Sequence, residues 1–399
     1  MIGYTLLNQN IVSGAARQVL LLCNNPDWYS AAQDEARFSG GSIDRAVSAT
    51  DALHRLVAPS HRFSQLLLEP DAAGTLIRDL VGVTAGETGS QVELVLLGDT
   101  DGLTESKTVR HARTPADLAH ILREQQPSVC RSAPRLSTSD VAIMFDAQNV
   151  ECRFQPIVSL ADRRPVGMET LVRLQHPEYG TIGPDQFIPQ IERAGLSLRL
   201  TEAVVLAVMR AIDPQMLQRY DLFVSINLPL DVLLFPESLE RVERHRRHAG
   251  IPVERILIEL TESRPVNDLA GLTQALGWWR DAGYRVAIDD MGPEMMNQLN
   301  LFDLPFNVVK LDKQVVLRSQ SDALARNYLK RTVNNAKSRS LEVIAEGIEN
   351  EAMWIRMRDM DVEYAQGYLI ARALPASALP VWLESWSTQL TLPHDRTTS

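Results

Sequence analysis

Apolar residues along this chain occur in short runs separated by segments of helix length. In the first third, three runs are typical of buried strands: residues 18–24 (QVLLLCN), 63–70 (FSQLLLEP) and 92–99 (VELVLLGD). Apolar residues recur with helical spacing in three further segments, at residues 49–57, 75–83 and 115–124. A shorter strand is expected near Ile43. This alternation predicts a small doubly wound α/β domain over residues 1–125.

A change in composition marks the end of this first domain. Residues 126–138 are rich in serine and proline, and Pro127 and Pro134 discourage a helix. We interpret this segment as a linker. With 399 residues, the chain also exceeds the size at which a single core usually stops growing. A second domain is therefore expected, at residues 139–390, followed by a polar tail at 391–399.

Seven strand-like runs in the second half each end in a carboxylate, an amide or a lysine. They read METLVR (Glu169), VSINL (Asn227), LIELTE (Glu259, Glu262), VAIDD (Asp289, Asp290), VVKLD (Lys310), VIAEGIE (Glu346, Glu349) and YAQGYL (Gln366). Their spacing indicates repeated βα units and a parallel sheet. The simplest container for polar groups at so many strand ends is a (β/α)₈ TIM-like barrel, because its strand C-termini converge on one face.

The chemistry of these strand ends favours a metal site. A single glutamate after an apolar strand is more often a solvated cap, but several carboxylates in one cleft repel each other unless protons or metal ions neutralise them. Oxygen ligands without histidine or cysteine select Mg²⁺ or Mn²⁺ rather than zinc. Consecutive strand residues point to opposite faces, so Asp289 and Asp290 can act together only if Asp290 lies where that alternation breaks.

Composition restricts the partners and the compartment. A hydrophobic content of 45% and a charged content of 23% are ordinary for a folded protein. The net charge of −10 argues against general nucleic-acid or anionic-membrane binding, although it does not exclude a small phosphate ligand. The 3 cysteines have no CxxC spacing, and no run approaches the roughly 20 apolar residues of a membrane span. We expect a cytoplasmic protein.

The second domain resembles a known family. The segment FQPIVSLADRRPVGMETLVRLQHPEYGTIGPDQFIPQIERAGL is similar to the opening of the EAL family of cyclic diguanylate (cyclic di-GMP) phosphodiesterases. The similarity continues, in the family's order, through SINLPL, IELTES, IDDMG, VKLDK, AEGIE and AQGYLIARALP. It covers about two-thirds of the chain. The tripeptide that gives the family its name reads Glu169-Thr170-Leu171 here.

The resemblance implies an EAL-type barrel that hydrolyses cyclic di-GMP to linear pGpG with two Mg²⁺ or Mn²⁺ ions. One metal would be held by Glu169, Asn227, Glu259 and Asp289. The second would be shared by Asp289 with Asp290 and Glu346. Lys310 would orient or deprotonate the attacking water.

The resemblance also implies the surroundings of the metals and of the substrate. Glu349 and Gln366 would complete the environment of the water and of the metal ions. Arg173, four residues after Glu169, corresponds to a phosphate-binding arginine, for which a planar guanidinium is suited. Gln155 and Leu171 would line the substrate site.

One loop departs from the family pattern. After the paired aspartates, active members continue through an aromatic residue, a Gly-x-Gly turn, a tyrosine and two serines, whereas this chain reads Met291-Gly292-Pro293-Glu294-Met295-Met296-Asn297. Pro293 fixes φ near −65°, so the loop backbone must differ. The counterpart of Glu262 anchors this loop in the family. The departure leaves two alternatives to hydrolysis open: a non-enzymatic cyclic di-GMP sensor, and a scaffold that binds no nucleotide.

The first domain resembles a bacterial response-regulator receiver domain in the order of its elements alone. Receivers need an acidic pair, an acceptor aspartate, a hydroxyl and a lysine, but the corresponding positions hold Asn24 and Asn25, Glu69, Gly98 and Arg113. Asp71 lies near the acceptor position. We therefore expect a non-phosphorylated pseudo-receiver that serves in dimerisation or binds a protein partner. A homodimer is expected in which this domain repositions residues 291–297.

Overall fold

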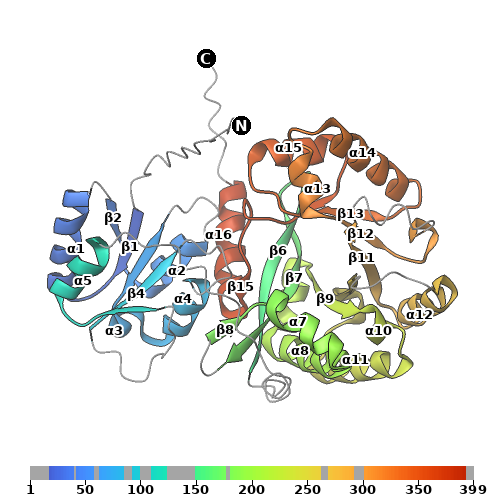
Figure 1. Ribbon diagram of the computed structural model, residues 1–399, viewed down its shortest axis with the longest axis horizontal. Coiled ribbons are helices and arrows are strands. Elements are labelled where there is room, and N and C mark those ends of the chain that lie inside the picture. Colours follow the sequence, from blue (N-terminus) through green and yellow to red (C-terminus); the bar gives the residue numbers. More distant parts are fainter. Residues whose placement is uncertain are drawn as a thin grey trace, which may run out of the picture.

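The computed structural model describes residues 18–39, 42–57, 63–84, 92–98, 109–123, 149–176, 180–261, 268–291 and 301–391. They form a smaller N-terminal α/β unit and a larger barrel (Figure 1). The predicted linker, Glu262 and residues 292–297 of the atypical loop lie outside the described residues.

The N-terminal unit is a five-stranded parallel sheet in the order β2-β1-β3-β4-β5. Its strands are β1 (Gln18–Leu22), β2 (Ser42–Arg45), β3 (Gln65–Leu68), β4 (Glu93–Leu97) and β5 (Arg110–Ala112). Its helices are α1 (Pro26–Ser39), α2 (Ala49–Val57), α3 (Pro70–Ala73), η1 (Gly74–Leu76), α4 (Ile77–Thr84) and α5 (Pro115–Arg123). Alternate strand residues face opposite sides. Leu20 and Leu22 therefore share an apolar cluster with α2 and α4, whereas Val19 and Leu21 share one with α1 and α5. The order and the two covered faces are those of a doubly wound sheet.

The second unit is a closed ring of eight strands in the order β6-β7-β9-β10-β11-β12-β13-β14. The strands are β6 (Val150–Ser159), β7 (Pro165–His176), β9 (Phe223–Pro229), β10 (Ile256–Thr261), β11 (Arg285–Met291), β12 (Val308–Leu311), β13 (Glu342–Ala345) and β14 (Tyr364–Ala365). Two short strands, β8 (Gly180–Ile182) and β15 (Leu374–Pro375), pair outside the ring with β7 and β6.

The expectation of a fully parallel barrel is wrong for one strand. The strands from β7 to β14 run parallel, but β6 is antiparallel to both its neighbours, β7 and β14. The cause is local, because only residues 160–164 connect β6 to β7. A parallel crossover needs a dozen or more residues, whereas so short a connection makes a hairpin.

Helices surround the ring. They are α7 (Pro184–Arg193), α8 (Ser197–Ala211), α9 (Pro214–Tyr220), α10 (Leu230–Leu233), α11 (Pro236–Ala249), η2 (Val253–Arg255), α12 (Leu269–Asp281), η4 (Leu301–Asp303), α13 (Lys313–Arg318), α14 (Ala323–Lys337), α15 (Glu351–Asp359), η5 (Ala376–Ala378) and α16 (Leu379–Thr391). No helix among the described residues has the length and apolar content that crossing a membrane requires.

An apolar layer fills the interior of the barrel. Every strand of the ring contributes one residue: Ile157, Val166, Phe223, Leu257, Ala287, Val308, Ile344 and Tyr364. A Cβ at Gly167 would lie only 2.6 Å from the Phe223 ring, so this glycine allows the ring to fill the centre. The layer closes one end of the barrel, and the polar residues collect toward the other.

The two units contact each other through α16. This helix lies between the N-terminal unit and the barrel (Figure 1), and it packs against α2, while α4 packs against β15. Apolar residues of both units belong to one continuous cluster, which includes Leu53, Leu80 and Trp382. His54 Nδ1 lies 2.6 Å from Ser385 Oγ across the contact. The contact is at β6 and β15, across the ring from β11, which precedes the atypical loop.

Candidate functional site

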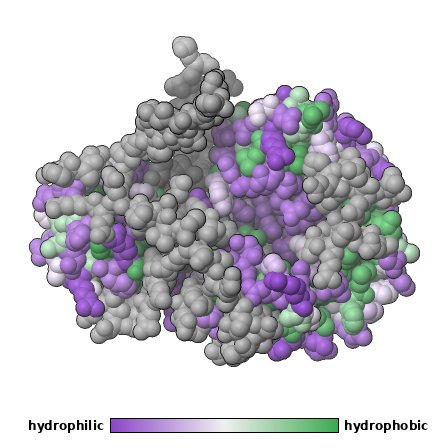
Figure 2. Space-filling model, viewed as in Figure 1, coloured by the Kyte–Doolittle hydropathy of each residue, from purple (hydrophilic) through white to green (hydrophobic). Residues whose placement is uncertain are grey.

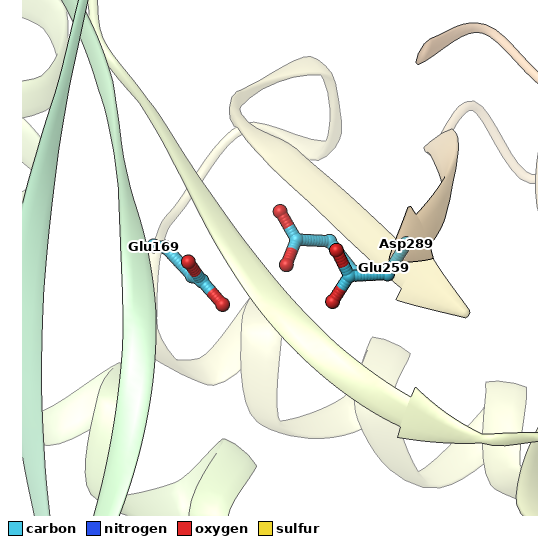
Figure 3. Close-up of side chains that lie close together, drawn as sticks. All are labelled: Glu169, Glu259 and Asp289. Carbon is cyan, nitrogen blue, oxygen red and sulfur yellow. The ribbon is translucent and has the colours of Figure 1, made fainter. Parts of the chain in front are cut away.

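The polar strand ends meet around one buried ammonium group. Lys310, on β12, is fully buried, and its Nζ lies 2.9 Å from Glu259 Oε2, 2.9 Å from Asp289 Oδ1 and 2.8 Å from Glu346 Oε1. Its distance to Glu169 Oε1 is 3.4 Å. Figure 3 shows the carboxylates of Glu169, Glu259 and Asp289 converging from three different strands. We call these five residues, together with Asp290, the acidic cluster.

Strand register brings the cluster together. Glu259 of β10 lies opposite Asn227 of β9, and Glu169 of β7 lies opposite Gln155 of β6. The side-chain amide of Asn227 donates to Glu169 Oε1 at 3.3 Å, which links the two neighbouring strands β7 and β9. The side chains that the sequence analysis assigned to the first metal therefore lie in contact range of one another.

Asp290 joins the cluster because the strand alternation breaks there, as its predicted use requires. The register between β11 and β12 shifts between Ile288 and Met291, and Asp290 has a φ of 50°. Its backbone N–H donates to Asp289 Oδ1 at 3.0 Å. Two groups of acids result, in which the ligand atoms lie within 4.8 Å of one another: Glu169, Glu259 and Asp289, and Asp289, Asp290 and Glu346.

Burial and mutual repulsion perturb the titration of these groups. Burial raises the pKa of Glu259 to about 8, although the Lys310 charge opposes the shift. Burial and the Asp289 charge raise the pKa of Asp290 to about 6, and burial also raises that of Glu346. Burial acts in the same direction on Glu169, but Lys310 and two amide donors lower its pKa overall. The lysine is held charged, because the surrounding carboxylates raise its pKa against the effect of burial.

The site lacks positive charge for the number of its carboxylates. Among the residues that the structure describes, five acids surround a single ammonium, and protons therefore bind to some of these acids at pH values well above the ordinary range of carboxylates. The buried carboxylate and amide oxygens without a hydrogen-bond donor among the described residues include three at this site: Asn227 Oδ1, Glu259 Oε1 and Gln366 Oε1. Hard cations bind carboxylate and amide oxygens, so this donor set fits Mg²⁺ or Mn²⁺.

The other predicted residues take up distinct places. Gln366 lies inside the cluster, where its amide donates to Glu169 and, at 3.4 Å, to Gln155 Oε1. Arg173 is buried and lies four residues beyond Glu169 on β7, with Leu171 between them and only partly buried. One Arg173 guanidinium N–H donates to the Val172 carbonyl at 2.8 Å.

Glu349 lies apart from the acidic cluster. It is exposed and pairs with Lys313 at 3.1 Å, and Lys313 lies 5.1 Å from the centre of the Tyr368 ring. Arg372 covers the same ring at 4.2 Å. The sequence analysis did not identify this group of side chains around the Tyr368 ring. Its position in the sequence offers a signal, because Lys313 lies three residues after Lys310 and Tyr368 lies two residues after Gln366.

In the N-terminal unit, a glutamate side chain links the C-terminal ends of two neighbouring strands, β1 and β3. Glu69, after β3, accepts hydrogen bonds from the backbone N–H groups of Asn24 at 2.5 Å and Asn25 at 3.2 Å. A carboxylate is favourable there, because these N–H groups precede the N-terminus of α1. Glu69, which stands where a receiver domain has its phosphoryl-accepting aspartate, therefore accepts hydrogen bonds from the backbone of its own domain.

The fold and the cluster together define a β/α barrel protein with a site suited to hard cations. The EAL domain family matches residues 138–373, more than half of the chain, and the chain belongs to this family. The resemblance seen in the sequence is thereby confirmed for the barrel.

Several proteins of known name are similar to this chain. The probable cyclic di-GMP phosphodiesterase PdeB of Escherichia coli (strain K12) is 32% identical over 268 residues, which are 67% of this chain and 49% of that protein. The cyclic di-GMP phosphodiesterase NbdA of Pseudomonas aeruginosa is 28% identical over 357 residues, 88% of this chain and 45% of that protein. The chain thus spans about half the length of these curated relatives.

Solved structures share the barrel. The PaMucR phosphodiesterase in complex with c-di-GMP matches 60% of this chain and 98% of that chain, with a TM-score of 0.56 and 25% sequence identity. The cAMP- and cyclic-di-GMP-bound EAL enzyme Bd1971 matches 61% of this chain and 67% of that chain, with a TM-score of 0.57. At 24% identity, the second likeness supports the fold alone.

Proposed function

We propose that this protein hydrolyses cyclic di-GMP to linear pGpG with Mg²⁺ or Mn²⁺ and so lowers the level of this second messenger. The observation that carries the proposal is the pair of acid groups that share Asp289. Two cations about 4 Å apart neutralise phosphate oxygens and activate water when they are bound in such a site. The first group, with Asn227, would hold one ion, and Asp289, Asp290 and Glu346 would hold the other.

The remaining side chains would position the reactants. Lys310 is held in its charged form, which suits orienting a water by donating to it rather than removing a proton. Gln366 fixes Glu169 by the hydrogen bond that it donates. Arg173 would bind a phosphate, with Gln155 and Leu171 beside the substrate. Glu349 lies outside the acidic cluster and would have to leave its ion pair with Lys313 to reach the water and the metal ions.

The N-terminal unit would be a receiver-like regulatory domain that accepts no phosphoryl group. Its support is the strand order and the internal capture of Glu69 by two backbone N–H groups. We propose a cytoplasmic homodimer in which this domain adjusts turnover or binds a protein partner.

The test is direct. The pure protein is incubated with cyclic di-GMP and Mn²⁺, and linear product is followed by chromatography. Glu169→Ala should abolish product. Glu342→Ala is the matched control, because Glu342 begins β13, away from the cluster, and pairs with Arg285. Binding of cyclic di-GMP without product at high protein concentration would select the sensor, and absence of binding would select the scaffold.

A further inference from the structure

Two buried arginines lie on one side of the β6–β7 hairpin, beyond the acidic cluster. Along β6, Ile157 belongs to the apolar layer inside the barrel, and Gln155 accepts a hydrogen bond from Gln366 beside the cluster, so Arg153 faces the same side by strand alternation. Arg153 lies opposite Leu171, and Arg173 lies two residues farther along β7. The exposed fractions of Arg153 and Arg173 are 6% and 3%. The hairpin thus presents two guanidinium groups where β7 leaves the barrel.

Carboxylates of both units act on the charge of Arg153. Glu151 Oε1 lies 2.8 Å from Arg153 Nη2. Asp79, on α4 of the N-terminal unit, accepts a hydrogen bond from Ser377, two residues beyond Pro375, which is opposite Arg153 in the β15–β6 pairing. Burial lowers the pKa of Arg153, and Glu151 and Asp79 both oppose that effect. The N-terminal unit therefore supplies one of the charges that compensate this buried arginine.

The excess of carboxylates in the acidic cluster means that arginines outside it can bind a phosphate of the substrate. A cyclic dinucleotide carries two phosphates, and only one of them can be cleaved at the acidic cluster in a given event. The second phosphate needs cationic donors away from the cluster, because the described part of the cluster has five carboxylates around one ammonium. A guanidinium matches a phosphate by two parallel hydrogen bonds.

We propose that Arg153 is a further substrate-binding residue that contacts the phosphate not being cleaved, and that Asp79 of the N-terminal unit competes with this phosphate for it. The inference rests on the proposed cyclic dinucleotide ligand. When the nucleotide binds, a phosphate oxygen replaces Asp79 as a compensating charge for Arg153. Any change that moves α4 away from β15 then strengthens nucleotide binding, which makes this contact a restraint imposed by the N-terminal unit.

The experiment measures equilibrium binding of cyclic di-GMP to the full chain in EDTA, where the proposed reaction cannot proceed. Arg153→Met should weaken binding by about 10- to 100-fold, the range expected for a lost hydrogen bond to a charged group. Arg153→Lys should restore part of the affinity, because it keeps the charge without the planar donor pair. Asp79→Asn should tighten binding by about 2- to 5-fold, since it keeps an acceptor for Ser377 but removes the competing charge.

Matched controls separate these effects from net charge and from stability. Asp34→Asn makes the same charge change on the exposed side of α1, and Arg164→Met removes an exposed arginine at the turn of the hairpin. Both should bind like the wild type. Melting temperatures identify variants that fail to fold. If Arg153→Met does not fold, the affinity of Asp79→Asn for cyclic di-GMP tests the proposal instead.

The outcomes distinguish the two proposals. Unchanged affinity in folded Arg153→Met, or weaker binding in Asp79→Asn, would overturn the role of Arg153. Binding that follows the expected order, without product in Mn²⁺, would leave this role standing and refute hydrolysis. A wild type that binds no cyclic di-GMP would refute both.

Discussion

Replacing Lys310 with methionine tests whether its ammonium is the internal counter-ion of the acidic cluster. Four carboxylates lie between 2.8 and 3.4 Å from its Nζ, and the side chain is fully buried. Methionine has a similar length and fills irregular space well, so the substitution removes the charge with little loss of packing. The variant therefore isolates the electrostatic contribution.

The expected loss of stability in Lys310→Met follows from the complete burial of this side chain. Removing one partner of a buried ion pair costs about 3–5 kcal/mol, because it leaves an uncompensated charge. For a unit of this size, that corresponds to a fall in melting temperature of roughly 6–20 °C. The loss should be largest at pH 8 and smaller at pH 6. A carboxyl such as Glu259, whose folded pKa is raised to about 8, binds protons preferentially in the folded state, and this contribution is lost as the pH rises.

The assay is thermal denaturation in EDTA and in Mn²⁺. Lys337→Met is the control, because Lys337 bridges two acids at the surface, Asp361 at 2.5 Å and Glu363 at 3.0 Å. Its loss should cost less than about 1 kcal/mol. Mn²⁺ should stabilise Lys310→Met more than the wild type, since the ion replaces the missing charge. A Lys310→Met variant that melts with the wild type in EDTA at pH 8 would refute the reasoning.

Four further predictions concern the rest of the chain. Hydrogen bonds from Arg246 and Tyr284 lower the pKa of Glu243 to about 2, so Glu243→Gln should be less stable than the wild type by about 1 kcal/mol at pH 7. This difference should disappear in melting curves as the pH falls from about 4.5 toward 2. Acetyl phosphate should leave the mass of the protein unchanged, and a phosphoryl adduct lost in Asp71→Asn would contradict the pseudo-receiver interpretation. Light scattering should give a dimer for the full chain, and a monomer would contradict the proposed homodimer. A barrel that begins at Ser139 should melt at a lower temperature than the full chain, because α16 has lost its contact with α2. An equal melting temperature would contradict this statement.

The sequence predicts the acidic cluster because its members share a simple pattern. Glu259, Asp289 and Lys310, together with the neighbouring Asn227, each lie near the C-terminal end of an apolar strand, and parallel strands bring such ends to one face. Glu169 lies in the first half of β7, which extends seven residues beyond it. The pairing of Asp289 with Asp290 is also foreseeable, because it demands a break in alternation that the backbone provides.

The same pattern could not reveal the polar residues of β6. This strand is antiparallel, so the residues near the site, Arg153 and Gln155, lie at its beginning rather than its end. Only the resemblance to the EAL family drew attention to Gln155, and Arg153 was not found. The hydrogen bond between Asp79 and Ser377 was equally hidden, since it joins side chains far apart in the sequence. The exposed position of Glu349 depends on the local turn, where Gly347 has a φ of 68°.

The closure of the barrel on β6 has a consequence for the order in which the chain folds during synthesis. One edge of strand β6 pairs with Tyr364 and Leu374, more than 200 residues later in the chain. The ring can therefore close only after residues 364–374 have left the ribosome, whereas the strands of the N-terminal sheet all precede β6 and can pair first. Until α16 is synthesised, the apolar surface of α2 that it covers stays exposed to solvent, and a chaperone would find its largest binding surface during this interval.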